Sequence, residues 1–299
     1  MKQQTIGLLA ACLTALLWGF LAIALKVSLT TLDSFTIVWF RFTFAFIVLF
    51  ISLLIFKKGK LQVFKSIPWE FILCGILLGF NYIGFMKGIE YTSPSTTQII
   101  IQIGPLILAV IGLSYFKETI AFKQILGFVL ALIGFGLFYF DGLSHMLNTD
   151  LFNSGALWII FGAISWSFYA FLQKKSAHKI SSQEGNLIIY GSASLMFIAF
   201  CNFTSLVMVK THEWPLIIFL GLNTLLAYGA LAIALSKAPA NKISIIITLN
   251  PLITIFGMNL LAFLGVDWIE PETISTKGYL GALLVLVGAL LVTFFRKKS

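Results

Sequence analysis

Two stretches of the sequence, 146 residues apart, each place two polar residues four positions apart and then a proline. They contain Gln98, Gln102 and Pro105 in the first case, and Ser244, Thr248 and Pro251 in the second. Residues four apart share one face of a helix, and a proline leaves a backbone carbonyl about one turn earlier without its usual donor. Such amide, hydroxyl and carbonyl groups can hydrogen-bond a solute in a cavity, or they can join helices. We favour the cavity.

Further amide and aromatic side chains stand inside apolar segments rather than near their ends, where tryptophan usually collects in membrane proteins. Together with the polar pairs, the candidate substrate-pathway residues are Trp18, Asn81, Tyr82, Gln98, Gln102, Trp166, Tyr169, Tyr228, Ser244, Thr248 and Asn250. Aromatic rings with a few amides can hold an amphipathic solute by stacking and hydrogen bonding. Each ring can equally be an ordinary packing residue, and both interpretations stay open.

Four residues have expected structural or gating roles. Arg41 could attract a carboxylate through its guanidinium, or it could snorkel outward or cap a helix end. The second half of the chain offers no matching arginine, so we favour the structural role. Glu118, beside Lys117 and Lys123, is expected to fix a helix end or a gate. Pro105 and Pro251 are expected to interrupt their helices.

Groups that would support catalysis do not converge anywhere in the sequence. The histidines (His145, His178, His212) fall in connections between apolar segments, the cysteines (Cys12, Cys74, Cys201) lack metal-ligand spacing, and there is no phosphate-binding loop. We therefore expect no enzyme, no metal and no cofactor. The acidic residues all lie near segment ends rather than at membrane depth, which favours facilitated diffusion or exchange over obligate proton coupling.

Apolar segments make up most of the chain. Of its 299 residues, 59% are hydrophobic and 10% charged, against about 25% charged in a soluble domain. A helix needs roughly 20 apolar residues to cross a bilayer. The sequence predicts ten such spans, at about 5–29, 34–56, 69–89, 94–116, 120–140, 153–173, 185–209, 214–236, 241–265 and 278–295. The expected fold is an all-α integral membrane protein.

The basic residues between spans predict the orientation. With a cytoplasmic N-terminus, fifteen Lys and Arg residues fall on the cytoplasmic side and four on the other, as the positive-inside rule requires. Both termini are then cytoplasmic. Membrane topology thus accounts for the basic residues behind the net charge of +9. We therefore expect no nucleic-acid partner.

The two halves of the sequence repeat the same landmarks in the same order. Trp18 matches Trp166, Tyr82 matches Tyr228, and the run GFVLALIG from Gly127 matches GALLVLVG from Gly281. Five spans per half make the second copy enter the membrane from the opposite side. We expect inverted repeats at 1–146 and 147–299, which are typical of secondary transporters that alternate access around a midplane site. A channel, a receptor or a purely structural bundle remains an alternative.

Small residues recur in the fifth and tenth spans of this pattern. They are Gly127, Ala131 and Gly134 in the fifth span, and Gly281 and Gly288 in the tenth. Small side chains let helices approach closely. These two spans are therefore expected to form a packing unit.

The chain resembles the EamA-type branch of the drug/metabolite transporter superfamily over essentially its whole length. The matching residues are Trp18-Gly19, Arg41-Phe42, Tyr82, Pro105, Glu118, Gly127 and Gly134. The ninth span departs from the pattern, because Gly265-Val266-Asp267 stands where the family usually has Gly-Glu. Asp267 therefore need not act as Glu118 does.

This resemblance implies a cavity between the halves, lined mainly by spans 1, 3, 4, 6, 8 and 9, with a possible homodimer through spans 5 and 10. It slightly favours export. A lining of aromatics and amides without a charge cluster suits a zwitterionic or neutral metabolite, with amino acids first and other metabolites or amphipathic drugs as the alternative. We expect the protein in the plasma (inner) membrane of a bacterium.

Overall fold

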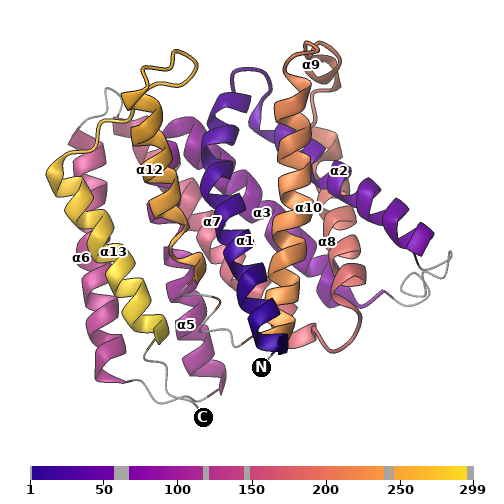
Figure 1. Cartoon of the computed structure of the whole chain (residues 1–299), viewed down its shortest axis with the longest axis horizontal. Helices are drawn as coiled ribbons and strands as arrows, with labels where there is room; N and C mark the ends of the chain where they lie inside the picture. The colour runs from indigo at the N-terminus through magenta and orange to yellow at the C-terminus, as the bar shows by residue number, and fades with distance from the viewer. Residues whose placement is uncertain are drawn as a thin grey trace.

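The computed structural model describes residues 2–56, 67–116, 121–144, 149–238, 243 and 246–294. Every regular element within these residues is a helix (Figure 1). In chain order they are α1 (Lys2–Ser28), α2 (Ser34–Phe56), α3 (Trp69–Tyr91), α4 (Pro94–Ile100), α5 (Ile103–Phe116), α6 (Phe122–Ser144), α7 (Thr149–Ser176), α8 (Ser182–Phe197), the short 3₁₀ helix η2 (Ile198–Phe200), α9 (Phe203–Val207), α10 (Trp214–Lys237), α12 (Asn250–Phe263) and α13 (Thr276–Phe294).

Six of the described helices are long and apolar enough to cross a bilayer, namely α1, α2, α3, α6, α7 and α10. The helices α12 and α13 are shorter apolar helices. Large apolar side chains also cover the outer surface, such as Phe122, Leu132 and Phe140 on α6. An outer surface of this kind is stable against lipid tails rather than water. The chain is therefore an all-α, multi-pass membrane protein.

The predicted fourth span, 94–116, is not one continuous helix. A turn at 101–102 separates α4 from α5. Pro105 has no N–H to donate to the Ile101 carbonyl one turn earlier, and that carbonyl instead accepts a tighter bond from the Gly104 N–H at 2.9 Å. The helix is interrupted four residues before Pro105, and Gln102 lies within the break.

A similar interruption precedes α12 in the predicted ninth span, 241–265. Thr248 and Leu249 form a turn, and α12 begins at Asn250 with Pro251 in its first turn. Proline is well suited to this position because its missing N–H has no partner in a first turn in any case. Residues 239–242, 244 and 245 lie outside the described residues, so the predicted site residue Ser244 is not placed.

The predicted seventh span, 185–209, is wrong as a single helix. α8 begins earlier, at Ser182, and ends at Phe197. Two separate short helices, η2 and α9, follow it. Asn202 begins α9, since its Oδ1 accepts the Ser205 N–H at 3.1 Å, while its own N–H donates to Thr36 Oγ1 at 2.8 Å. The local hydrogen bonds of an asparagine compete with helix continuation, and a hydropathy window cannot detect them.

Two small-residue faces join α6 to α13, which lie side by side in Figure 1. A Cβ added at Gly134 would lie 2.6 Å from the Gly281 carbonyl oxygen, and one added at Gly288 would lie 2.5 Å from the Gly127 carbonyl oxygen. The backbones therefore meet where only glycine fits. The predicted packing unit of the fifth and tenth spans is confirmed.

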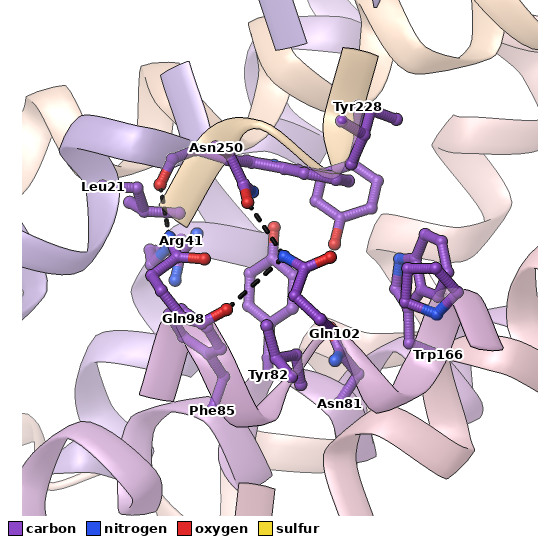
Figure 2. Close-up of a pocket in the computed structure, with 14 residues that line it drawn as sticks. Leu21, Arg41, Asn81, Tyr82, Phe85, Gln98, Gln102, Trp166, Tyr228 and Asn250 are labelled. Atoms are coloured by element: carbon purple, nitrogen blue, oxygen red, sulfur yellow. Dashed lines mark hydrogen bonds between the residues drawn. The ribbon is translucent and has the colours of Figure 1, made fainter. Parts of the chain in front are cut away.

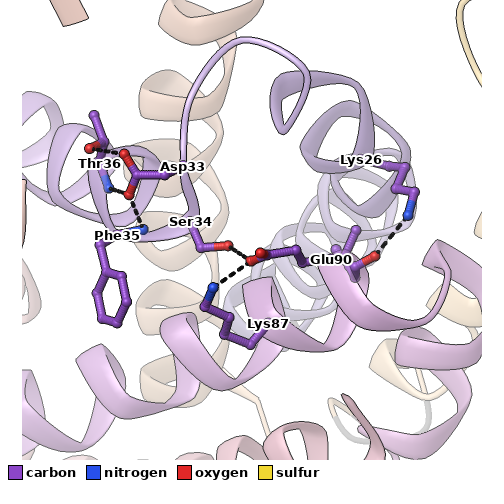
Figure 3. A network of polar contacts seen from close by, with 8 residues as sticks. Lys26, Asp33, Ser34, Phe35, Thr36, Lys87 and Glu90 are labelled. Carbon is purple, nitrogen blue, oxygen red and sulfur yellow. Dashed lines mark hydrogen bonds and ion pairs between the residues drawn. The ribbon is translucent and has the colours of Figure 1, made fainter. Parts of the chain in front are cut away.

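Hydrogen bonds fix the helix ends beside the α1–α2 turn (Figure 3). Asp33 caps α2, because its Oδ1 accepts the N–H groups of Phe35 and Thr36, both at 3.0 Å. The Ser34 hydroxyl donates to Glu90 of α3, which also pairs with Lys87 at 2.7 Å. The start of α1 and the end of α13 both lie at the opposite end of the bundle (Figure 1).

Candidate functional site

A cavity lies where α1, α3, α4, α5, α7, α10 and α12 converge, with one residue contributed by α2. Its volume is about 80 Å³, where a water molecule requires about 10–15 Å³ on the same measure. Eight of the predicted substrate-pathway residues line it: Trp18, Asn81, Tyr82, Gln98, Gln102, Trp166, Tyr228 and Asn250. The cavity is therefore large enough for a small organic solute and offers it both amides and rings.

Amide groups from both interrupted helices meet at the wall of the cavity (Figure 2). Gln102 Nε2 donates to Asn250 Oδ1 at 3.1 Å and, more weakly, to the Gln98 carbonyl at 3.4 Å. Gln98 Nε2 donates to the Trp18 carbonyl of α1 at 2.8 Å. Polar side chains next to the two prolines thus meet at the cavity wall.

Five aromatic rings line the same space: Trp18, Tyr82, Phe85, Trp166 and Tyr228. The Trp18 and Tyr228 ring centroids lie 5.2 Å apart, and those of Tyr82 and Tyr228 lie 5.8 Å apart. Trp166 contributes a further ring to the cavity wall. Asn81 supports this arrangement, because its Nδ2 donates to the Gly162 carbonyl at 3.1 Å and so ties α3 to α7. Rings at these separations pack against one another, so a solute would contact them from the cavity rather than lie between them.

Arg41 is the cation of the cavity lining. Its side chain is 2% exposed, and its Nε donates to Thr224 Oγ1 of α10 at 3.1 Å. The guanidinium carbon lies 4.3 Å from the centroid of the Tyr82 ring. The Tyr82 hydroxyl donates to the same Thr224 oxygen at 3.3 Å, so the three side chains form one buried unit.

The model of the EamA-like transporter family matches residues 5–140 and again residues 153–294. An uncharacterized transporter of Haemophilus influenzae is 33% identical over 295 residues, covering 97% of this chain and 96% of that protein. The chain belongs to the EamA-like transporter family.

Other comparisons agree with this EamA-like assignment. The uncharacterized inner membrane transporter YhbE of Escherichia coli is 32% identical, over 97% of this chain and 92% of that protein. The S-adenosylmethionine uptake transporter of Rickettsia prowazekii is 29% identical over about half of each chain, 51% and 49%. A crystal structure at 18% identity superposes with a TM-score of 0.69 over 99% of this chain and 100% of that one, which shows the shared fold.

Six of the EamA-like residues recognised in the sequence fall into two places. Trp18, Arg41, Tyr82 and Pro105 line the cavity. Gly127 and Gly134 lie at the contact between α6 and α13. Glu118 lies outside the described residues. The residues that match the family thus include both cavity-lining residues and residues that pack α6 against α13.

Three predicted residues lie behind the lining rather than in it. Tyr169 is 1% exposed and packs against Tyr228, with ring centroids 6.1 Å apart. Thr248 is fully buried and Pro251 is buried at the start of α12. Gln102 meets Asn250, not Thr248, because the turn at 248–249 rotates the next residues toward the cavity.

Sequence reasoning did not single out the apolar part of the lining or the support of Arg41. Leu21, Phe85, Ile101 and Ile247 line the cavity but resemble every other apolar residue in their spans. Thr224 left a usable signal, since it is a polar residue one helical turn before Tyr228. Among the described residues, no three His, Cys, Asp or Glu side chains gather as a metal site requires.

Proposed function

We propose that this EamA-like chain is a secondary transporter that moves a small zwitterionic or neutral metabolite, an amino acid first of all, by alternating access around this cavity. The observation that carries the proposal is a buried polar and aromatic cavity formed where segments 5–140 and 153–294 meet. Polar side chains at membrane depth are costly, so they usually mark a solute pathway or a packed interior. Here they surround a space.

Helix packing supports the proposed inverted repeats, 1–146 and 147–299. If the five spans of the first half correspond in order to those of the second, the contact of α3 with α7 corresponds to that of α1 with α10. In the same way, α5 with α7 corresponds to α12 with α1, and α3 with α8 corresponds to α10 with α2. A two-fold axis would relate these pairs. We therefore propose ten spans, with both termini in the cytoplasm and the chain in a bacterial inner membrane.

The size and chemistry of the cavity support a small solute. Its volume of about 80 Å³ corresponds to roughly five to eight water molecules, which is the scale of a small amino acid. Amides from Gln98, Gln102 and Asn250 would replace the water around such a solute, and the rings would contact its apolar part. The rings also favour a second candidate, an amphipathic drug or other metabolite. The cavity would have to open further to hold such a larger solute.

Several finer features belong to the same proposal. We propose no catalysis and no cofactor, and transport by facilitated diffusion or exchange. The family resemblance slightly favours export, while one relative is named for uptake. In facilitated diffusion or exchange, the solute gradients across the membrane would set the net direction of transport. The apolar outer faces of α6 and α13 would carry the homodimer that the resemblance implies.

Counterflow in proteoliposomes tests the proposal. Vesicles containing the purified chain are loaded with an unlabelled amino acid, and entry of the same labelled amino acid is measured. A carrier predicts saturable entry that accelerates when the solute is present on the far side. Conductance that does not saturate, with no such acceleration, would indicate a channel; acceleration by amphipathic drugs alone would favour the second candidate.

A further inference from the structure

The guanidinium of Arg41 is hydrogen-bonded through Nε, while its two terminal nitrogens have no partner among the described residues. Nε donates to Thr224 and the Tyr82 ring lies against its face. Within the described residues, no other hydrogen bond of this side chain exists, and the two ion pairs there, Lys87–Glu90 and Lys179–Glu70, lie elsewhere. Its terminal nitrogens therefore have no acceptor from the described part of the chain.

A buried cation without a counter-ion is unfavourable, because burial removes its hydration. Arg41 is 2% exposed and lines the cavity. A guanidinium presents its nitrogens as a planar fork that matches the two oxygens of a carboxylate. The group that fits this position is thus a carboxylate that enters with the solute.

The side-chain oxygen of Gln102 in the cavity wall also lacks a partner, and it needs a hydrogen-bond donor where Arg41 needs an acceptor. The Oε1 atom of Gln102 is buried and accepts no hydrogen bond among the described residues. Its orientation is fixed, because Nε2 of the same amide donates to two oxygens, Asn250 Oδ1 and the Gln98 carbonyl. Figure 2 shows this oxygen turned away from Asn250, toward the side of Trp166. A buried oxygen of this kind calls for a donor.

We propose that Arg41 binds the carboxylate and Gln102 Oε1 the ammonium group of a zwitterionic substrate, so that the two residues select α-amino acids or compounds with the same charge pair. The inference rests on the transport function proposed above. Tyr228 also lines this space, and aromatic rings attract cations. The sequence alone favoured a structural role for Arg41. The hydrogen bond from its Nε to Thr224 fits that role, while its terminal nitrogens would bind the substrate.

Matched analogues test the proposal on the purified full-length protein. The probes are glycine, alanine, serine, threonine and leucine, each with its carboxamide, which lacks the negative charge, and its 2-hydroxy acid, which lacks the ammonium group. Binding is measured by thermal stabilisation over a concentration series. We expect at least one amino acid to bind about tenfold or more tightly than its carboxamide, since hydrogen bonds to charged groups are the strong ones.

Two variants assign the charges to residues. Arg41→Gln should weaken binding of the amino acid and the hydroxy acid alike by about 10- to 100-fold. Gln102→Leu should leave carboxylate binding in place but remove the preference for the amino acid over the hydroxy acid. Asn259→Leu is the matched control, because Asn259 is exposed on α12, where it accepts the Tyr279 hydroxyl at 2.9 Å, and does not line the cavity; this variant should bind each probe as tightly as the unaltered protein does.

Each outcome decides the question. Equal binding of acids and carboxamides, or unchanged affinity in well-folded Arg41→Gln protein, overturns the role of Arg41. If Arg41→Gln fails to fold, the analogue series on the unaltered protein and the Gln102→Leu variant still decide. If no zwitterion binds, the charge-pair assignment is wrong, while counterflow with other metabolites shows independently whether the transport proposal stands.

Discussion

Thr224 connects the charged residue of the cavity to its neighbouring ring. Its Oγ1 accepts hydrogen bonds from Arg41 Nε and from the Tyr82 hydroxyl, and it donates to the Leu220 carbonyl at 3.1 Å. One hydroxyl on α10 thereby fixes side chains from α2 and α3. The position of the guanidinium depends on this group, because a long arginine side chain is otherwise free to choose among many rotamers.

Replacing this hydroxyl should destabilise the protein. Thr224→Val keeps the side-chain shape but leaves two buried donors without an acceptor, at a cost of about 1–3 kcal/mol each. We expect a lower thermal midpoint for Thr224→Val, whereas Thr224→Ser, which keeps the hydroxyl, should stay close to the unaltered protein. Equal midpoints for the two variants would show that Thr224 does not hold Arg41.

The amide pair Gln102 and Asn250 should show coupled effects on transport. Gln102→Ala removes a cavity amide and should raise the apparent KM several-fold to about tenfold, the effect of losing about one hydrogen bond, without lowering abundance. Asn250→Ala removes its partner. A double-mutant cycle on KM should show less than additive effects. Fully additive effects, or an unchanged KM in abundant Gln102→Ala protein, would place the solute elsewhere.

Sequence spacing could identify the cavity amides but not their partners. Gln98 and Gln102 were found because amides are rare in apolar spans and lie one turn apart. Their counterpart was predicted to be Thr248, yet Asn250 meets Gln102. The repeat offset assumes a uniform helix, and the turn before Pro251 changes which residue points inward. The placement of Arg41 likewise depended on Thr224, which belongs to a span 183 residues away in sequence.

Interrupted helices are the elements that build the site. The break between α4 and α5 was predictable, since it follows from the missing N–H of Pro105. The start of a separate α9 was not, because its N-cap residue, Asn202, is held by Thr36 from a distant part of the chain. Hydropathy therefore locates the six long apolar helices, while local and tertiary hydrogen bonds help to set where helices begin and end.

The contact between α6 and α13 offers a matched pair of substitutions. Gly134→Leu would drive a side chain into the α13 backbone, whereas a Cβ at Gly136 on the same helix meets nothing within 4 Å. We expect Gly134→Leu to lower the thermal midpoint and the folded yield, since overpacking costs about 1–3 kcal/mol or more. Gly136→Leu should have little effect. Similar stability of the two variants would contradict this packing.

The connection between α12 and α13 carries a pH-sensitive contact to α4. Glu272 Oε1 accepts the Ser95 N–H at 2.9 Å, while Oε2 is buried and has no partner among the described residues. Burial raises the pKa of the Glu272 carboxyl, and hydrogen bonds from Ser95 and the charge of Lys26 offset part of this rise in pKa. The folded protein therefore retains this proton at a higher pH than the unfolded chain does.

This raised pKa predicts a direction for stability. The contribution of Glu272 is fully present below the ordinary carboxyl pKa and is lost as the pH rises through the raised pKa. Between about pH 4 and about pH 7, the thermal midpoint of the unaltered protein should fall relative to that of Glu272→Gln, which cannot ionise. A constant difference between the two midpoints over this range would refute the prediction.

At the scale of the whole molecule, the orientation rests on the distribution of basic residues. Single cysteines introduced at Lys179 and at His212, in a background without native cysteines, should report opposite sides of the membrane. We expect an impermeant thiol reagent to label position 179 only from the cytoplasm and position 212 only from outside. The reverse pattern would invert the orientation, and labelling of both positions from one side would contradict the span arrangement.

The most direct test of the central claim is the accessibility of the cavity from the two sides of the membrane. Leu21 lines the cavity without contributing a polar group, so a cysteine there should report access without removing a hydrogen bond. Alternating access predicts that impermeant thiol reagents label Leu21→Cys from either side, and that a transported amino acid slows labelling from both. Labelling from one side only, or labelling from both sides at once at rates that no solute alters, would contradict a carrier with a central site.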